Sequence, residues 1–83
     1  MNRLIIKAEA GIVNAEVGTG WRDWNNAINA RTGCIVPLSD GSELWCDEEA
    51  LCKNNPVRNA TASLLAEQEI YGDVILFKKG DIK

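Results

Sequence analysis

Histidine is absent from this sequence of 83 residues. Its imidazole is the side chain that most often serves as a general base near neutral pH. The absence excludes Ser-His-Asp triads, Cys-His pairs and histidine-based zinc sites. No other group of side chains has the make-up of a centre that moves protons or activates water unaided. We therefore expect a protein that is not an enzyme, needs no cofactor and acts by binding.

Basic charge and long apolar runs are also scarce. Nine Lys and Arg residues stand against twelve Asp and Glu residues, which gives a net charge of −3. Double-stranded nucleic acid is not expected as a partner, because binding to its phosphates needs a basic surplus. The apolar run 4–6 stops at Lys7, far short of a signal peptide or of the ~20 apolar residues that cross a membrane. No contact with a membrane is expected.

Cysteine occurs three times, at Cys34, Cys46 and Cys52. An odd number cannot form a closed set of disulfides, and reduced thiols are typical of the cytoplasm. We expect a cytoplasmic protein, located in the cytoplasm of the host cell if its source is a virus. Three thiolates can ligate zinc together with a carboxylate, but no Cys-x-x-Cys spacing is present. The favoured interpretation is that the cysteines are buried and act as small apolar side chains.

The remaining composition, 46% apolar and 25% charged, is typical of globular proteins, and residues 1–83 are predicted to form a single domain. Apolar, β-branched residues predict a strand at 4–8. The next segment either stays extended or bends at Gly11 and forms a second strand toward Val17.

A helix is predicted over residues 21–31, because Trp21, Trp24 and Ile28 fall on one helical face. Thr19 is the expected N-cap. The polar residues of this segment, Asn25 among them, are expected on the opposite face.

Two apolar runs, 34–38 and 43–47, flank an Asp-Gly pair and predict a β-hairpin. A turn centred on that pair places Val36 opposite Trp45. Both faces of the hairpin are apolar, so both are expected to be covered. Pro37 has no N–H to donate, which places its strand at an edge of the sheet.

The C-terminal half is expected to hold a turn or short helix at 47–53 and a strand at 70–77, buried in the centre of the sheet because its apolar run is continuous. Between them, 57–67 is predicted to be helical in its later part. The apolar side of that helix is expected to comprise Ala60, Leu64, Leu65 and Ala66. A charged tail with a turn at 80–81 follows. The predicted fold class is α+β, a small and mostly antiparallel sheet with a β-hairpin, covered by one or two helices.

Three tryptophans in so short a chain form the first candidate binding site. An exposed indole can stack on a nucleobase or anchor a protein partner. The alternative is that Trp21, Trp24 and Trp45 fill the core. The two interpretations are compatible, and a half-covered Trp21 is then the natural platform for a ligand.

The second candidate is the junction at 56–61, where polar recognition groups lie close together. Arg58 can clamp a carboxylate or phosphate, Asn59 can bind an amide or base edge, and Thr61 can donate to an anion. The alternative is structural: Asn59 or Thr61 caps the helix and Arg58 is an exposed charge.

Acidic residues form a third candidate. Asp47, Glu48 and Asp73 are the side chains on which a metal-dependent hydrolase would rely. The alternative is that the run Asp47-Glu48-Glu49 is a solvated turn that supplies negative charge to a helix N-terminus.

The second half of the chain also resembles a known family. The segments 44–51 (LWCDEEAL), 55–61 (NPVRNAT) and 70–76 (IYGDVIL) are similar to a family of short uncharacterised proteins, mostly from bacteriophages and mobile elements and classed as a domain of unknown function. The resemblance spans about residues 35–77 and leaves the two-tryptophan helix unmatched. It implies a compact α+β domain of viral or mobile-element origin, and it implies no activity.

Together these observations predict a small phage-type binding protein without catalysis. It would antagonise a host defence by occupying a host protein or by sequestering a nucleotide-like signal. For such a signal, the predicted binding residues are Trp21, Trp24, Arg58, Asn59 and Thr61. A homo-oligomer is expected, because a small domain gains core and pocket by associating. The alternatives are a structural or regulatory subunit of a viral complex and a metal-dependent hydrolase.

Overall fold

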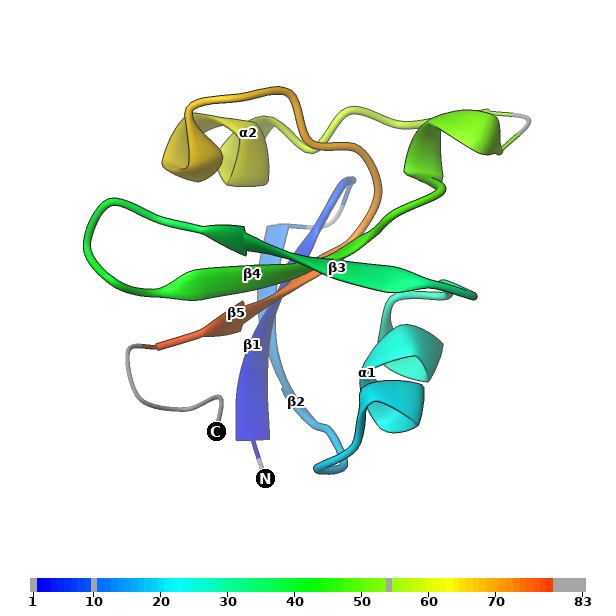
Figure 1. Cartoon of the computed structure of the whole chain (residues 1–83), viewed down its shortest axis with the longest axis vertical. Helices are drawn as coiled ribbons and strands as arrows, with labels where there is room; N and C mark the ends of the chain where they lie inside the picture. Colours follow the sequence, from blue (N-terminus) through cyan, green and yellow to red (C-terminus); the bar gives the residue numbers. More distant parts are fainter. Residues whose placement is uncertain (1, 10, 54, 79–83) are drawn as a thin grey trace.

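The computed structural model describes residues 2–9, 11–53 and 55–78, and their strands form one antiparallel sheet (Figure 1). The strands are β1 Asn2–Lys7, β2 Gly11–Glu16, β3 Gly33–Pro37, β4 Glu43–Asp47 and β5 Val74–Phe77. Their spatial order is β2-β1-β5-β4-β3, and every neighbouring pair is antiparallel. The predicted fold class, a small α+β protein with an antiparallel sheet and a hairpin, is confirmed. The turn predicted at 80–81 lies outside the described residues.

Two short helices lie on opposite faces of this sheet (Figure 1). Helix α1, Trp21–Ala27, packs on the face that carries Ile5 and Ile75, whereas α2, Ala60–Ala66, covers the face that carries Ile6 and Val74. A 3₁₀ turn, η1 Ala50–Cys52, follows β4. Both faces of the sheet are therefore covered, as the two apolar faces of the hairpin predict. No helix of the described part of the chain is long and apolar enough to span a bilayer.

Strand β5 lies at the centre of the sheet, between β1 and β4. Its residues Val74, Ile75 and Phe77 are fully buried. A strand covered on both faces has no solvent side for polar residues, which is why its sequence is an unbroken apolar run. The prediction of a buried central strand is confirmed.

The β3–β4 hairpin forms where expected, but its predicted register was wrong by one residue. Val36 lies opposite Leu44, whereas the Asp-Gly turn placed it opposite Trp45. The loop has three residues instead of two, because Leu38 N donates to Ser42 O at 2.8 Å and closes the hairpin one position earlier. Asp40 Oδ1 accepts from Ser42 N at 2.9 Å, and Gly41 adopts a left-handed φ of 91°, the backbone that a three-residue loop requires.

Strand β3 is an edge strand, as Pro37 predicts. At its two ends Leu38 N donates to Ser42 O and Thr32 O accepts from Glu48 N. In an antiparallel pair, residues whose backbone groups bond to the partner strand alternate with residues whose groups point away from it. In that alternation Pro37 occupies a position whose backbone nitrogen points away from β4. The missing N–H therefore costs the sheet no hydrogen bond.

Helix α1 begins at Trp21 as predicted and ends at Ala27, earlier than the apolar spacing indicated. Gly20 is the N-cap residue and no side chain caps the helix, so the prediction of Thr19 was wrong. The placement of Asn25 on the solvent face was also wrong, because Asn25 is buried. Its Oδ1 accepts from Trp45 Nε1 at 2.8 Å and its Nδ2 donates to Arg31 O at 3.2 Å.

Helix α2 turns a largely different face to the core from the predicted one, and of the four residues predicted there Ala66 packs against the core. Leu64 is 80% exposed and Leu65 is also exposed, whereas Ala62 and Ser63 are buried. Polar anchors decide this rotation: the Ser63 hydroxyl donates to Ile70 O and accepts from Ile70 N at 2.8 Å. Buried backbone groups must be satisfied, and this requirement outweighs the burial of two leucines.

Candidate functional site

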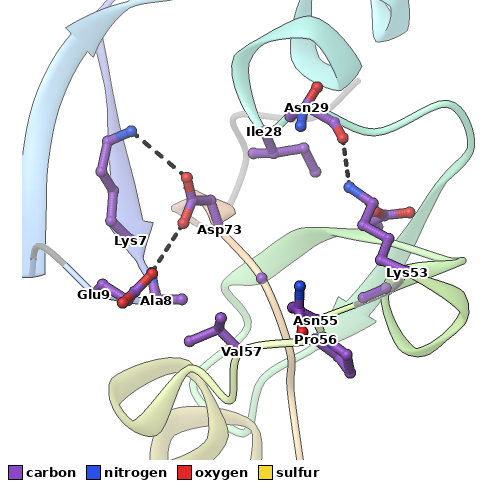
Figure 2. A pocket seen from close by; sticks show the side chains of 13 residues that line it. Lys7, Ala8, Glu9, Ile28, Asn29, Lys53, Asn55, Pro56, Val57 and Asp73 are labelled. Carbon is purple, nitrogen blue, oxygen red and sulfur yellow. Dashed lines mark hydrogen bonds and ion pairs between the residues drawn. The ribbon is translucent and has the colours of Figure 1, made fainter.

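A cavity of about 310 Å³ lies at the end of the sheet where β1 and β4 finish and β5 begins (Figure 2). It is bounded by the turn after β1, the end of α1, η1 and the segment that precedes α2. Its polar lining consists of Lys7, Glu9, Asn29, Asp47, Lys53, Asn55 and Asp73. Strand ends and loops meet here, which is where recognition groups usually gather on a rigid scaffold.

One side of the cavity carries an ion pair between Lys7 and Asp73 (Figure 2). Lys7 Nζ lies 3.5 Å from Asp73 Oδ2, and Asp73 Oδ1 accepts from Ala8 N at 2.9 Å. Both side chains are partly exposed, so the pair contributes little to stability. The backbone bond nevertheless holds the carboxylate in the lining of the cavity.

The opposite side carries a second pair, between Lys53 and the buried Asp47. Asp47 Oδ1 accepts from Glu49 N at 2.9 Å, and Lys53 Nζ lies 2.8 Å from Asp47 Oδ2. Lys53 Nζ also donates to Asn29 O at 2.6 Å (Figure 2). A buried carboxylate without a cation is strongly destabilising, so Lys53 is held in place by the charge that it neutralises.

Apolar groups complete the lining between the two pairs. Ile28, Pro56 and Val57 line the cavity together with Ala8 and Ala50. The cavity thus combines an apolar wall with two ammonium groups and their paired carboxylates. It counts one more carboxylate than ammonium groups, because Glu9 also lines it.

The acidic residues singled out from the sequence divide between this cavity and its surroundings. Asp47 and Asp73 line it, and each is paired with a lysine. Glu48 is exposed and does not line it. Over residues 2–9, 11–53 and 55–78, no group of three or more His, Cys, Asp or Glu side chains is placed to hold a metal ion.

The tryptophans take different positions. Trp24 packs edge-on against Trp45 with ring centroids 5.1 Å apart, lies 4.8 Å from Phe77, and donates through Nε1 to Gly18 O at 3.0 Å. Trp24 and Trp45 are therefore part of the core on the α1 face. Trp21 is 54% exposed, and the Arg22 guanidinium lies 5.2 Å from its ring centroid. Trp21 is thus half-covered, the condition under which its indole was predicted to serve as a platform for a ligand.

The junction that precedes α2 is mainly structural. Asn59 is the N-cap of α2: its Oδ1 accepts from Ala62 N at 3.0 Å, which confirms the capping interpretation. Its Nδ2 donates to Ile6 O and to Gly72 O, so no polar atom of this amide points to solvent. Arg58 is exposed and pairs with Glu69 at 3.4 Å. Thr61 is exposed on α2.

The five predicted binding residues do not form one site within the chain. Trp21 and Trp24 belong to α1, on one face of the sheet, whereas Arg58, Asn59 and Thr61 lie at the start of α2 on the other face. The two cavity lysines, Lys7 and Lys53, were not among the residues predicted from the sequence. Only their positions in the sequence could have indicated them, because Lys7 is the last residue of a strand and Lys53 directly follows η1.

The cysteines are free thiols of very different exposure: Cys46 is buried, Cys34 is half-buried and Cys52 is exposed. Burial is the main cause that raises the pKa of Cys46 to about 12 from an ordinary value of 9.0, and the nearby Cys34 and Asp47 add to it. Burial also raises the pKa of Cys34, with help from Glu48 and Asp47. Neither of these two thiols has the low pKa of a reactive cysteine.

The raised pKa of Cys46 predicts a loss of stability in alkali. Above pH 9 the thiol ionises in the unfolded chain but stays protonated in the folded one, so the free energy of unfolding falls as pH rises from about 9 to about 12. At about pH 10.5 the expected loss is ~2 kcal/mol. Urea unfolding at pH 8 and pH 10.5 measures it. In Cys46→Ala the unfolding free energy should no longer show this fall with pH, whereas in Cys52→Ser the fall should remain. An equal fall in the two variants would contradict the assignment of the effect to Cys46.

No family model, no curated protein and no solved structure matches the chain. The resemblance to short phage and mobile-element proteins therefore stays a prediction.

Proposed function

We propose that the chain is a non-catalytic binding protein that holds a small zwitterionic ligand, such as an α-amino acid, in the cavity between Lys7 and Lys53. The single observation that carries the proposal is the arrangement of two Lys–Asp pairs on opposite sides of an apolar-walled cavity. The volume of about 310 Å³ lies at the small end of the range for ligand sites.

The hydrogen-bonding capacity of the two pairs supports a ligand of both charges. An ammonium group has three donors. Lys53 uses one of them on Asn29 O and forms an ion pair with Asp47, and Lys7 forms an ion pair with Asp73. Each lysine therefore retains a donor for a ligand carboxylate, while Asp73 retains lone pairs for a ligand ammonium.

The charge balance supports the same class of ligand. The lining carries one more carboxylate than ammonium groups, so a dianion would meet net repulsion in a cavity partly shielded from water. A zwitterion avoids this repulsion, because its carboxylate can bind a lysine ammonium group and its ammonium group can bind a carboxylate of the lining. A nucleotide-like ligand relies instead on Trp21 and Arg58, which lie on opposite faces of the sheet, and is favoured only if two copies build a shared pocket.

Isothermal calorimetry on the full chain tests the proposal. We expect an α-amino acid with a branched side chain to bind, and the corresponding amine and carboxylic acid, each lacking one charge, to bind at least about tenfold more weakly. Lys7→Met should weaken binding by a similar factor with little loss of stability, because Lys7 is partly exposed.

The matched control is Arg58→Ala, which removes an exposed cation outside the cavity and should leave amino-acid binding unchanged. Adenine nucleotides belong in the same panel. Binding of a nucleotide that Arg58→Ala abolishes, with no response to amino acids, would replace the cavity proposal by the nucleotide-sequestering function.

A second candidate function, a structural or regulatory subunit of a larger complex, is favoured by a specific observation. Leu64 and Leu51, 80% and 68% exposed, flank the segment Gln68-Glu69. Exposed apolar side chains rimmed by polar residues such as these mark a surface that a protein partner can cover. Occupation of a host protein to antagonise a host defence, the role expected of a phage-type protein, would use this surface.

A further inference from the structure

Strand β2 is an edge of the sheet, and no other strand of residues 2–9, 11–53 and 55–78 covers its outer side. It spans Gly11–Glu16 and, within the part of the chain that the structure describes, pairs only with β1. Natural edge strands usually carry a proline, a lysine or a bulge that prevents pairing with another chain. Strand β3, at the opposite edge, has Pro37. Strand β2 has neither proline nor lysine, and its register with β1 is uninterrupted over six residue pairs.

The backbone alternation identifies which groups of β2 face outward. Along an antiparallel strand, residues whose N–H and C=O bond to one neighbouring strand alternate with residues that bond to the other. Because each of the four strand pairs has a constant register, the outward position of the Pro37 nitrogen fixes this alternation in every strand as far as β2. It leaves Val13 bonded to β1 and directs the N–H and C=O of Ile12 and Asn14 to the open side. The Ile12 side chain beside them is 55% exposed.

We propose that β2 pairs antiparallel with β2 of a second copy of this chain, with Val13 on the two-fold axis, so that two sheets join into one. In this register Ile12 of each copy lies opposite Asn14 of the other, and their outward backbone groups form two complete hydrogen-bonded pairs. Val13 meets its own symmetry mate at a non-hydrogen-bonded position, where cross-strand side chains come closest and β-branched pairs are favourable.

Charge favours a second copy in this antiparallel arrangement. The only charged residue of β2 is Glu16, and the two copies of Glu16 lie at opposite ends of the paired strands, about 20 Å apart, beyond the reach of strong repulsion at physiological salt. A parallel pairing would place them side by side. Because β2 does not line the cavity, the interface is independent of the proposed ligand.

Analytical ultracentrifugation of the full chain should show a monomer–dimer equilibrium. Ile12→Lys is expected to raise the dimer dissociation constant at least about tenfold. The control is Ile35→Lys, which changes the exposed isoleucine of the other edge strand and should leave the equilibrium unchanged. A chain that stays monomeric at about 1 mM, or equal effects of the two substitutions, would overturn the proposal.

Cysteine crosslinking tests the register without relying on a weakened interface. In a Cys52→Ser background, Val13→Cys should form a disulfide-linked dimer under mild oxidation, because the two cysteines face each other across the axis. Ala15→Cys, on the same face but opposite Gly11 of the other copy, should not. Crosslinking through position 15 in preference to position 13 would exclude this register.

Discussion

Replacing Asn59 by alanine is expected to lower the free energy of unfolding by about 3–4 kcal/mol. Asn59 is 1% exposed and makes three hydrogen bonds to the backbone, from Ala62 N and to the carbonyls of Ile6 and Gly72. Alanine removes the helix cap and takes one buried donor away from each of the carbonyls of Ile6 and Gly72. Chemical denaturation of the full chain measures the loss.

The aspartate variant separates the two parts of this role. Asn59→Asp keeps the oxygen that caps α2 but replaces the amide donor with an oxygen that faces the carbonyls of Ile6 and Gly72. We expect it to destabilise the protein as much as alanine does. Thr61→Ala, at an exposed position of the same helix, should change the stability by less than about 0.5 kcal/mol. A fully stable Asn59→Asp variant would show that capping alone explains this residue.

The second large effect is expected at Gly33, where alanine should cost about 2–3 kcal/mol because of overpacking. A Cβ at this position would lie 2.3 Å from Trp45 Cε2 and Cζ2. The indole cannot move aside easily. Its Nε1 donates to the buried Asn25 at 2.8 Å, and Trp24 packs against its ring.

Gly20→Ala is the matched control for this prediction. The nearest atom to a Cβ at Gly20 is Asp23 Oδ2 at 3.9 Å, an ordinary contact, and the backbone there has a φ of −108° that alanine adopts without strain. Its thermal midpoint should stay within a few degrees of that of the natural sequence. Equal shifts for the two variants would mean that loss of glycine flexibility, and not the contact with Trp45, determines the effect at Gly33.

Much of the fold could be predicted from local sequence patterns. The apolar run that became β5, the Asp-Gly turn and the edge position of Pro37 each follow from the chemistry of a few neighbouring residues. The register of the hairpin and the rotation of α2 do not, because single polar contacts decide them. The Asp40 carboxylate shapes the turn, and the Ser63 hydroxyl holds α2 against Ile70.

The candidate site was harder to predict for a related reason. Lys7 and Asp73 are 66 positions apart in the sequence and meet only because β1 and β5 are neighbours in the sheet. Nothing in the local sequence of either residue signals the other. The tryptophans and the segment around Arg58 attracted attention because their residues are close in sequence, but α1 and α2 place them on opposite faces.

The central position of β5 also bears on how the protein is made. The β1–β2 and β3–β4 hairpins touch each other through β5, so a nascent chain that has not yet reached Val74 holds two separate hairpins. Isolated hairpins are marginally stable in water. During translation the complete sheet can therefore form only after the four residues of β5 have been synthesised. Until those residues leave the ribosome, the strand edges that β5 will cover in both hairpins stay unpaired and prone to aggregation.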